Sequence, residues 1–329
     1  TVSTDSLYTK HSILSLNEEN IHVIRSPNQL LQNTYFWAHH EKLCIIDHTV
    51  AFLGGIDLCY GRYDTPDHVL VDDSKVDFNA LNPESLSPEE FIRFQTFPGK
   101  DYSNPRVKDF FGLDKPYESM YDRDSTPRMP WHDVHMLTSG KIARDLSRHF
   151  VQRWNYLLRQ KRPSRFTPLL TPPPDLSDKE VEEMGLGGTC EVQLLRSSGN
   201  WSLGLKQHEQ SIQNAYLKLI ETSEHFVYIE NQFFVTSCFI DGTEIQNRIG
   251  DALVDRIIKA HNEGTNWRAV IVIPLMPGFE SQVDEPDGSS VRVIMQCQYM
   301  SISRVTTSIF AKLKKYGINP DDYIHFFSL

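Results

Sequence analysis

Residues 37–58 read WAHHEKLCIIDHTVAFLGGIDL, and this stretch decides the expected fold. Its two short apolar runs, at 42–47 and 50–55, have the length and composition of β-strands. Only His48 and Thr49 separate the two runs, which predicts a hairpin at the centre of a sheet. A further run upstream, IHVIR at 21–25, also favours a strand.

The chain downstream of this hairpin changes character twice. Residues 61–130 are rich in Pro, Asp and aromatic residues without periodicity, which is typical of a long functional loop. HDVHML at 132–137 then predicts a strand, and 139–160 predicts an amphipathic helix. The apolar residues that suggest this helix recur every four positions: Ile142, Leu146, Phe150, Trp154 and Leu158. Residues 161–188 are rich in Pro and Gly and indicate a linker.

The second half repeats a rhythm of strands and helices. The predicted strands are CEVQLLRS (190–197), HFVYIE (225–230), RAVIVIPL (268–275) and YIHFFSL (323–329), and the predicted helices cover 205–220, 245–260 and 291–316. Strands that alternate with helices of this length predict an α/β fold with helices on the faces of the sheet.

Composition excludes several classes of protein. The 329 residues carry 33 basic and 43 acidic side chains, a net charge of -10, which argues against a general nucleic-acid-binding surface. The five cysteines are far apart and form no C-x-x-C pair, so neither a disulfide framework nor a zinc site is expected. No apolar run approaches the ~20 residues of a membrane span. A reducing, cytoplasmic setting fits this composition.

The motif in residues 37–58 combines His40, Lys42 and Asp47 as H-x-K-x4-D, followed by Gly54-Gly55. In an extended chain, residues i and i+2 share a face, so His40 and Lys42 project into one pocket. The ammonium disfavours protonation of the imidazole, which leaves a neutral nitrogen available as nucleophile, while Lys42 binds an anionic oxygen. This pairing suits attack on a phosphodiester. The alternative is an exposed strand edge with Asp47 closing a turn.

Basic residues concentrate in the region of the predicted helix. Eight cations stand between 141 and 165 with one acid among them. This indicates an anionic-surface footprint, and the alternative is a solvated helix face. Four of these cations are arginines within the predicted helix: Arg144, Arg148, Arg153 and Arg159.

Together with the H-x-K-x4-D motif, four further motifs occur in an order that resembles one family. They are IDLCYGRYDT, PRMPWHD, RHFVQRWN and YIENQFF. The chain resembles the eukaryotic phospholipase D enzymes, most closely those of fungi. The resemblance implies two similar α/β halves, each donating one such motif to a shared site, and a phosphohistidine intermediate. It makes His40 the nucleophile and Lys42 the clamp on the phosphate oxygens, with no metal or other cofactor.

The resemblance also assigns roles to residues around the motif. Asp47 would buttress the site, and Asp133 would accept a hydrogen bond from His40 Nδ1 and fix its tautomer. The alternative for Asp133 is a cap of a helix or turn. Gly54 and Gly55 are grouped with the substrate-binding residues.

YIENQFF at 228–234 would lie beside the catalytic pocket, where its polar residues would hydrogen-bond the phosphate or headgroup. These residues are Glu230, Asn231 and Gln232. Trp131 or Phe233 would offer a π-face to a quaternary ammonium. From composition alone, YIENQFF is simply the end of a strand.

No second H-x-K occurs in the chain, and RVTTS at 304–308 departs from the family pattern. We therefore expect residues 1–160 to be the C-terminal part of a first repeat, 161–188 a linker, and 189–329 the N-terminal part of a second repeat. The expected function is phospholipase D: hydrolysis of phosphatidylcholine to phosphatidic acid and choline, or transphosphatidylation, with this stretch inactive alone.

Two alternatives stay open: a non-catalytic module that binds phosphoinositides or membranes, and a phosphodiesterase of the same fold acting on another diester. The expected partners are phosphatidylcholine, an anionic membrane surface and small GTPase regulators, without nucleic acid. The resemblance implies a phosphoinositide as activator, bound by Arg144, Arg148, Arg153 and Arg159, and a peripheral membrane location in the cytoplasm follows.

Overall fold

The structure is a computed structural model. It describes residues 6–27, 39–58, 61–62, 64–68, 70, 112, 114–115, 131–161, 163, 165–185, 188, 190–240, 242–275 and 289–328. Contacts divide the chain into two compact units, one built mainly from residues up to Glu209 and the other mainly from Gln210 onward. These are called the N-terminal and C-terminal units below. Most of the predicted loop 61–130 lies outside the described residues.

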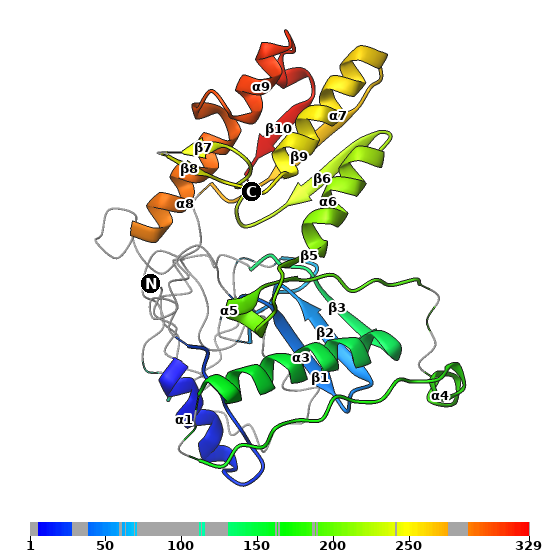
Figure 1. Ribbon diagram of the computed structural model, residues 1–329, viewed down its shortest axis with the longest axis vertical. Coiled ribbons are helices and arrows are strands. Elements are labelled where there is room, and N and C mark those ends of the chain that lie inside the picture. Colours follow the sequence, from blue (N-terminus) through cyan, green and yellow to red (C-terminus); the bar gives the residue numbers. More distant parts are fainter. Residues whose placement is uncertain are drawn as a thin grey trace. The chain divides into compact units, whose positions relative to one another are not determined.

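An antiparallel sheet of three strands lies at the centre of the N-terminal unit (Figure 1). The strands β1 (Lys42–Ile46), β2 (Val50–Gly54) and β3 (His135–Ser139) pair in the order β1-β2-β3. The register aligns Lys42 with Gly54 and Gly54 with His135. The predicted hairpin is confirmed, with β2 central and β1 at the edge. The third strand starts at His135, so Asp133 precedes it.

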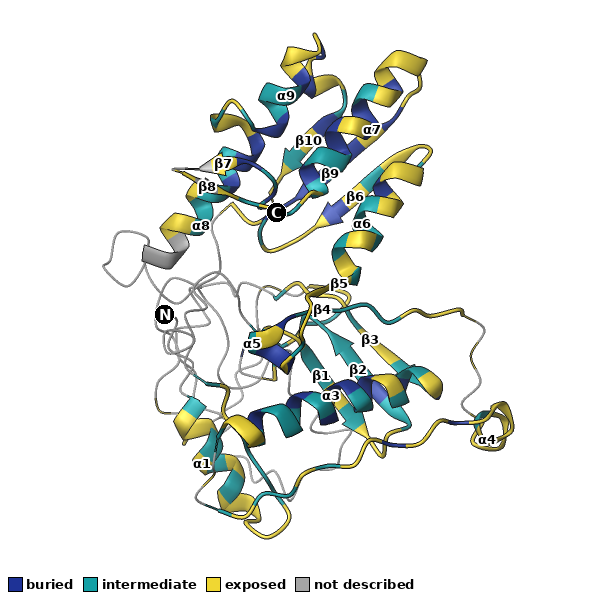
Figure 2. Ribbon diagram, viewed as in Figure 1, coloured by how far each residue is buried: buried dark blue, intermediate teal, exposed yellow. Residues whose placement is uncertain are grey.

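Helix α3 (Lys141–Gln160) packs on this sheet, as the amphipathic pattern predicts. Ala143 and Leu146 are buried against Ala51 of β2. The predicted apolar stripe is wrong in detail, because Phe150 remains 41% exposed. A spacing of four residues drifts by about 40° per step around a helix of 3.6 residues per turn, so such a stripe leaves the buried face. Figure 2 shows the buried side of α3.

The predicted linker 161–188 is ordered against α3 over part of its length. Trp154 Nε1 donates to Pro168 O at 2.9 Å, and the Asn155 amide exchanges two hydrogen bonds with the backbone of Leu170. The segment also contains the short helix α4 (Asp178–Glu183), which Ser177 caps. The compact units divide later, after Glu209. The assignment of two repeats around this linker stays a prediction.

Two predicted strands of the N-terminal unit are wrong. Residues 21–25 follow helix α1 (Ser6–Leu16) without regular structure, and residues 191–196 are likewise irregular. Lysine and arginine side chains supply hydrogen bonds to the first segment: Lys161 donates to Arg25 O at 2.7 Å. The second segment ends at the two-residue strand β4 (Ser197–Ser198), which precedes α5 (Asn200–Leu203) and β5 (Glu209–Gln210).

A parallel sheet forms the centre of the C-terminal unit. Its strands are β6 (Phe226–Glu230), β9 (Arg268–Val272) and β10 (Ile324–Phe327), in the order β10-β9-β6. Helix α6 (Ser211–Thr222) packs on α7 (Ile249–Glu263). The core includes the fully buried side chains of Trp267, Leu253, Ile257, Ile271 and Leu313. These three strands confirm their predictions, and the two helices begin four to six residues later than expected.

The predicted helix 291–316 is interrupted. The structure has α8 (Ser289–Tyr299), a π-helical turn (Met300–Arg304) and α9 (Ile309–Lys315). Val305 is extended, and Ser308 begins α9 by accepting a hydrogen bond from the backbone N–H of Ala311. Hydroxyl side chains favour helix starts over helix interiors, which explains the break at RVTTS.

Two remaining strands, β7 (Phe239–Ile240) and β8 (Thr243–Glu244), form a small hairpin. The predicted α/β class is confirmed, and the two three-stranded sheets of the described residues are one antiparallel and one parallel. No helix among the described residues is both long enough and apolar enough to cross a membrane.

Candidate active site

His40 and Lys42 lie at the start of β1, and the structure brings them together. Lys42 Nζ donates to the backbone oxygen of His40 at 2.7 Å and forms an ion pair with Asp57 Oδ1 at 3.1 Å. The Lys42 side chain is only 12% exposed. A largely buried ammonium held at two points is a defined anion clamp, because little side-chain freedom is left to lose when an anion binds.

The imidazole of His40 favours its neutral form. Partial burial lowers the pKa of His40 below the usual 6.5, and the Lys42 ammonium lowers the pKa further. The carboxylates of Asp57 and Asp133 act in the opposite direction. The net lowering agrees with the prediction that Lys42 helps to keep a ring nitrogen unprotonated and available for attack.

Asp57 is a site residue that the sequence reasoning missed. Its carboxylate pairs with Lys42 and, through Oδ2, with Arg62 at 3.4 Å. A signal was available in the hairpin: because Gly54 pairs with Lys42, residues just beyond Gly54 lie beside the start of β1. The first acidic residue in that position is Asp57.

Asp133 lies near His40 but takes a different partner from the one predicted. Its Oδ2 accepts a hydrogen bond from Trp131 Nε1. The guanidinium of Arg62 stacks over the Trp131 ring, with its carbon 3.5 Å from the ring centroid. Among the described residues, the expected hydrogen bond from His40 Nδ1 to Asp133 is not formed, although the Asp133 charge acts on the imidazole. One face of Trp131 therefore contacts Arg62, and its predicted role toward a quaternary ammonium stays a prediction.

Gly54 and Gly55 make room for the chain around Asp133. A Cβ at Gly55 would lie 1.8 Å from Asp133 Oδ1, and a Cβ at Gly54 would lie 2.3 Å from the backbone oxygen of Val134. Any side chain at either position collides with the segment leading into β3. The close approach explains the glycine pair through packing, and the predicted contact of the pair with substrate stays a prediction.

The structure places Asp47 away from Lys42, at the turn end of the hairpin. Asp47 and His48 have positive φ angles of 49° and 58° and form the tight turn between β1 and β2. A strand rises about 3.3 Å per residue, so five residues separate Asp47 from Lys42 by about 16 Å. The side chain of Asp47 is exposed at the far end of the hairpin. Asp is among the residues that tolerate this turn conformation, which agrees with the alternative that Asp47 closes a turn. Its buttressing role stays a prediction.

The residues of the YIENQFF motif belong to the C-terminal unit. Glu230 ends β6 and accepts a hydrogen bond from the Tyr228 hydroxyl at 2.8 Å. Asn231 continues the sheet by donating its backbone N–H to Val272 O, and both Asn231 and Gln232 are exposed. The two units are described separately, so the meeting of these residues with His40 stays a prediction.

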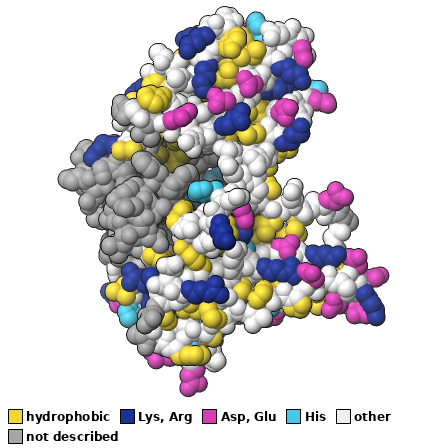
Figure 3. Space-filling model, viewed as in Figure 1, with side chains coloured by type: hydrophobic (Ala, Val, Ile, Leu, Met, Phe, Trp, Pro, Cys, Tyr) yellow, Lys and Arg dark blue, Asp and Glu magenta, His cyan; other side chains and the backbone are white. Residues whose placement is uncertain are grey.

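The four arginines of the predicted phosphoinositide site do not form one exposed surface. Arg153 is buried and donates to Ser202 O and to Ser26 Oγ. Arg148 forms ion pairs with Asp145 at 2.8 Å and Asp175 at 2.5 Å. On the face shown in Figure 3, basic side chains lie among acidic ones.

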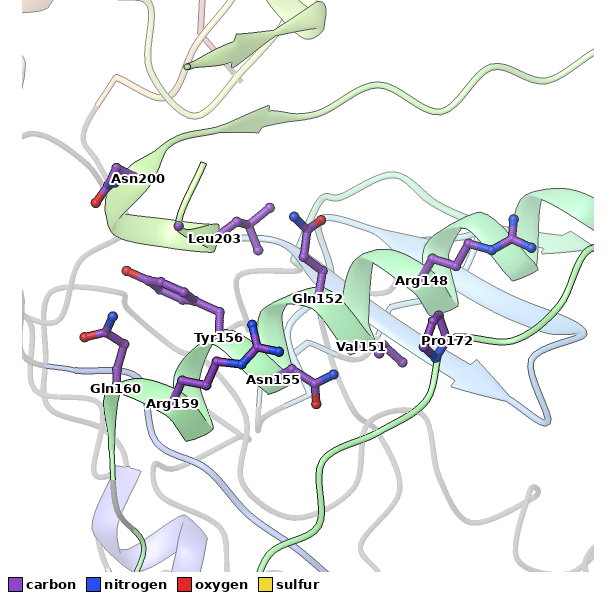
Figure 4. A pocket seen from close by; sticks show the side chains of 11 residues that line it. Arg148, Val151, Gln152, Asn155, Tyr156, Arg159, Gln160, Pro172, Asn200 and Leu203 are labelled. Atoms are coloured by element: carbon purple, nitrogen blue, oxygen red, sulfur yellow. The ribbon is translucent and has the colours of Figure 1, made fainter. Parts of the chain in front are cut away.

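Arg148 and Arg159 border an open groove of about 560 Å³ along α3 (Figure 4). Tyr156, Asn200 and Leu203 also line this groove, while Arg144 and Arg153 do not. None of the residues described above around His40 lines this groove. No group of three His, Cys, Asp or Glu side chains able to hold a metal ion occurs in the part of the chain that the structure describes.

Comparison with known proteins agrees with this geometry. The family model for Phospholipase D matches residues 16–81 and 108–329. The chain belongs to the phospholipase D family. It is 64% identical over 334 residues to Phospholipase D1 of Saccharomyces cerevisiae and 55% identical over 330 residues to Phospholipase D1 of Schizosaccharomyces pombe. Both alignments include 100% of this chain, but only 19% and 23% of the respective relatives.

A mammalian relative is also similar. Phospholipase D2 of Bos taurus is 42% identical over 323 residues, which include 95% of this chain and 34% of the relative. The chain therefore spans about a fifth of the length of its two yeast relatives and a third of the bovine one. The predicted resemblance to fungal members of the family is confirmed.

Proposed function

We propose that this chain supplies the nucleophile of a phospholipase D that cleaves phosphatidylcholine. The observation that carries the proposal is the His40 and Lys42 pair: a ring with a lowered pKa beside a largely buried ammonium. The names of the relatives, Phospholipase D1 and Phospholipase D2, support a phospholipid substrate.

In the first step, a neutral ring nitrogen of His40 attacks the phosphorus. The new N–P bond replaces the bond from phosphorus to the choline oxygen, and choline leaves after its oxygen takes up one proton. Lys42 binds the non-bridging oxygens, whose negative charge its ammonium compensates. The proton donor lies outside the single H-x-K motif of this chain, and the family resemblance assigns that role to a second copy of the motif.

In the second step, water or an alcohol attacks the phosphohistidine. The N–P bond breaks, the proton of the attacking hydroxyl is removed by a base, and His40 returns to its neutral form. Water gives phosphatidic acid, and an alcohol gives the transphosphatidylation product. Asp57 and Asp133 stabilise the positive charge that the ring carries while it is bonded to phosphorus, because both carboxylates favour the cationic ring.

Release of choline from phosphatidylcholine vesicles tests the proposal, with the natural protein that carries this sequence. We expect His40→Ala to lose activity by at least about a thousandfold, since loss of a nucleophile removes the covalent pathway. Acid-quenched samples of the unaltered protein should contain a phosphatidyl group on His40. His11→Asn, at an exposed position of α1, serves as the matched control. Undiminished turnover in the His40→Ala variant refutes the assignment.

The association with anionic membranes is a separate proposal. Of the four predicted arginines, Arg159 is exposed and borders the groove on α3, which supports a contact with a phosphoinositide headgroup. Flotation of the protein with vesicles containing phosphoinositide, with and without Arg159→Ala, tests this contact. Equal flotation of both proteins would remove Arg159 from the proposal. A peripheral membrane location and regulation by small GTPases stay proposals that rest on the resemblance.

A further inference from the structure

Glu41 stands between His40 and Lys42 in the chain, and the proposed chemistry does not use it. Both of its carboxylate oxygens lie 2.7 Å from Nε2 of His149 on α3. Its Oε1 also lies 2.9 Å from Nε2 of His39. Because side chains alternate along an extended chain, Glu41 points away from the side that carries His40 and Lys42. Glu41 therefore anchors this segment to α3 on the side opposite His40 and Lys42.

The partner of Glu41 is buried and fully engaged. The His149 side chain is 7% exposed, and its second nitrogen, Nδ1, lies 3.0 Å from NH1 of Arg196. A guanidinium can only donate, so Nδ1 of His149 must accept. The ring proton then sits on Nε2 and is donated to Glu41. Charged groups on both sides thus fix one neutral tautomer of His149.

Further ion pairs extend this arrangement. Arg196 donates to both oxygens of Glu209, at 2.5 and 2.9 Å, and to Gln152 Oε1 at 2.9 Å. Burial by itself raises the pKa of Glu41, but the hydrogen bonds from His149 and His39 outweigh burial and hold this pKa well below its usual range. Glu41 is therefore an anion at neutral pH. Arg153 and Arg196 are cations whose charges interact with this anion.

The backbone at His40 needs such support. The register of β1 with β2 begins at Lys42, so His40 precedes the paired strand, and β1 is an edge strand. The hydrogen bond from Lys42 Nζ to His40 O restrains the segment on the side that carries these two residues. The Glu41 side chain connects the same segment to α3, the longest helix of the N-terminal unit in the described residues.

We propose that Glu41 and His149 are positioning residues for the phosphodiester reaction, which fix the segment carrying His40 and Lys42 against α3. The inference rests on the proposed function. Neither residue touches the substrate. Their effect is on the orientation of the nucleophile and of the anion clamp, where a displacement of about 1 Å costs about a hundredfold in rate.

Two variants of His149 separate positioning from general packing. His149→Gln places an amide N–H close to the position of Nε2 and keeps the donor to Glu41. His149→Asn is too short to reach Glu41 and keeps only an acceptor close to Nδ1 for Arg196. Glu41→Gln and Glu41→Ala form the corresponding pair on the strand, since only Gln can still accept the proton on His149 Nε2.

Choline release by the natural protein that carries this sequence gives the first readout. We expect kcat to fall about thirtyfold to a hundredfold in His149→Asn and Glu41→Ala, and by less than about fivefold in His149→Gln and Glu41→Gln, with KM changed less than about threefold. His11→Asn is the control for a histidine change elsewhere. Equal kcat values for His149→Asn and His149→Gln, in proteins with matching thermal unfolding temperatures, overturn the proposal.

Two readouts do not require turnover. Imidazole ¹⁵N NMR should show a protonated Nε2 and an unprotonated Nδ1 for His149, and the opposite tautomer overturns the proposal. Orthovanadate, a phosphate analogue, should bind at least about tenfold more weakly to His149→Asn than to His149→Gln. An unaltered protein that binds vanadate without releasing choline refutes the proposed function alone, and the vanadate affinities of the variants then decide the role of Glu41 and His149. A protein that neither turns over nor binds vanadate refutes both proposals.

Discussion

Substitution of Gly55 by Ala tests how the glycine pair positions Asp133. The added Cβ would lie 1.8 Å from Asp133 Oδ1 and 2.6 Å from Cγ, well short of the 3.4 Å at which ordinary contact begins. The obstacle is the end of a side chain, so Asp133 can turn away. It then loses the hydrogen bond from Trp131 Nε1. A hydrogen bond to a charged group contributes about 1.5–3 kcal/mol. The smaller backbone entropy of unfolded Ala returns about 0.4–1 kcal/mol.

We therefore expect Gly55→Ala to destabilise the fold by about 1–2 kcal/mol in urea unfolding. Gly54→Ala is the matched comparison, because its Cβ meets backbone atoms, Val134 O at 2.3 Å and His135 Cα at 2.5 Å. Those atoms belong to or adjoin the β2–β3 ladder and cannot turn away, so the cost should reach about 3 kcal/mol. The two substitutions thus differ in cost because Gly55 faces the end of a side chain, whereas Gly54 faces backbone atoms.

Two further measurements decide whether Asp133 is the group displaced by Gly55→Ala. The Asp133 carboxylate raises the pKa of His40, so its departure should lower that pKa, as NMR titration of the ring would show. In the double variant Gly55→Ala with Asp133→Ala, the clash is absent. The destabilisation of the double variant should therefore be smaller than the sum of the destabilisations of the two single variants. Strict additivity, or an unchanged titration of His40 in Gly55→Ala, would refute the reasoning.

Four other outcomes follow from the structure. Asp57→Asn should lower the pKa of His40 further, because the Asp57 charge favours the protonated ring, and a rise in the NMR titration would contradict this. The folded-state pKa of His40 lies below the unfolded value of 6.5. The contribution of His40 to the free energy of unfolding is therefore fully present above pH 6.5, and it is lost as the pH falls through the folded-state pKa. Arg153→Ala should destabilise the fold by about 2–3 kcal/mol in urea unfolding, because a buried residue loses its contacts. Arg159→Ala, at an exposed position, should cost less than about 0.5 kcal/mol. Similar losses for the two variants would contradict the burial of Arg153 and the exposure of Arg159. Ser301→Ala leaves the buried backbone N–H of Thr236 without its acceptor and should destabilise the fold by about 1–3 kcal/mol in urea unfolding. An unchanged stability would show that another acceptor replaces the Ser301 hydroxyl.

Local patterns predicted most of the central strands. The runs at 42–47, 50–55 and 268–275 are apolar, short and bounded by polar or turn residues, and all three form strands. The runs at 21–25 and 190–197 look similar, but in the part of the chain that the structure describes they lack a partner strand over most of their length. A strand is stable only when a neighbour satisfies its backbone, and partner availability is not a local property of the sequence.

The candidate site was predicted to a similar extent. The prediction that His40 and Lys42 share a face follows from the alternation of an extended chain; in the structure the Lys42 ammonium contacts the backbone oxygen of His40 and its charge acts on the ring. The spacing of Asp47 in the motif does not show whether the chain continues straight or turns, and its buttressing role stays a prediction. Asp57, Arg62 and Trp131 become connected only when the hairpin and the start of β3 lie side by side.

The sequence by itself determined the α/β class, the hairpin and the placement of His40 close to Lys42, because alternation and apolar runs act over a few neighbouring residues. Only the tertiary structure decided which charges surround the imidazole and what supports it from behind. Glu41 and His149 are 108 positions apart in sequence and meet because α3 packs across the sheet. Contacts of this kind depend on burial and on exact complementarity between distant segments, and no local pattern records them.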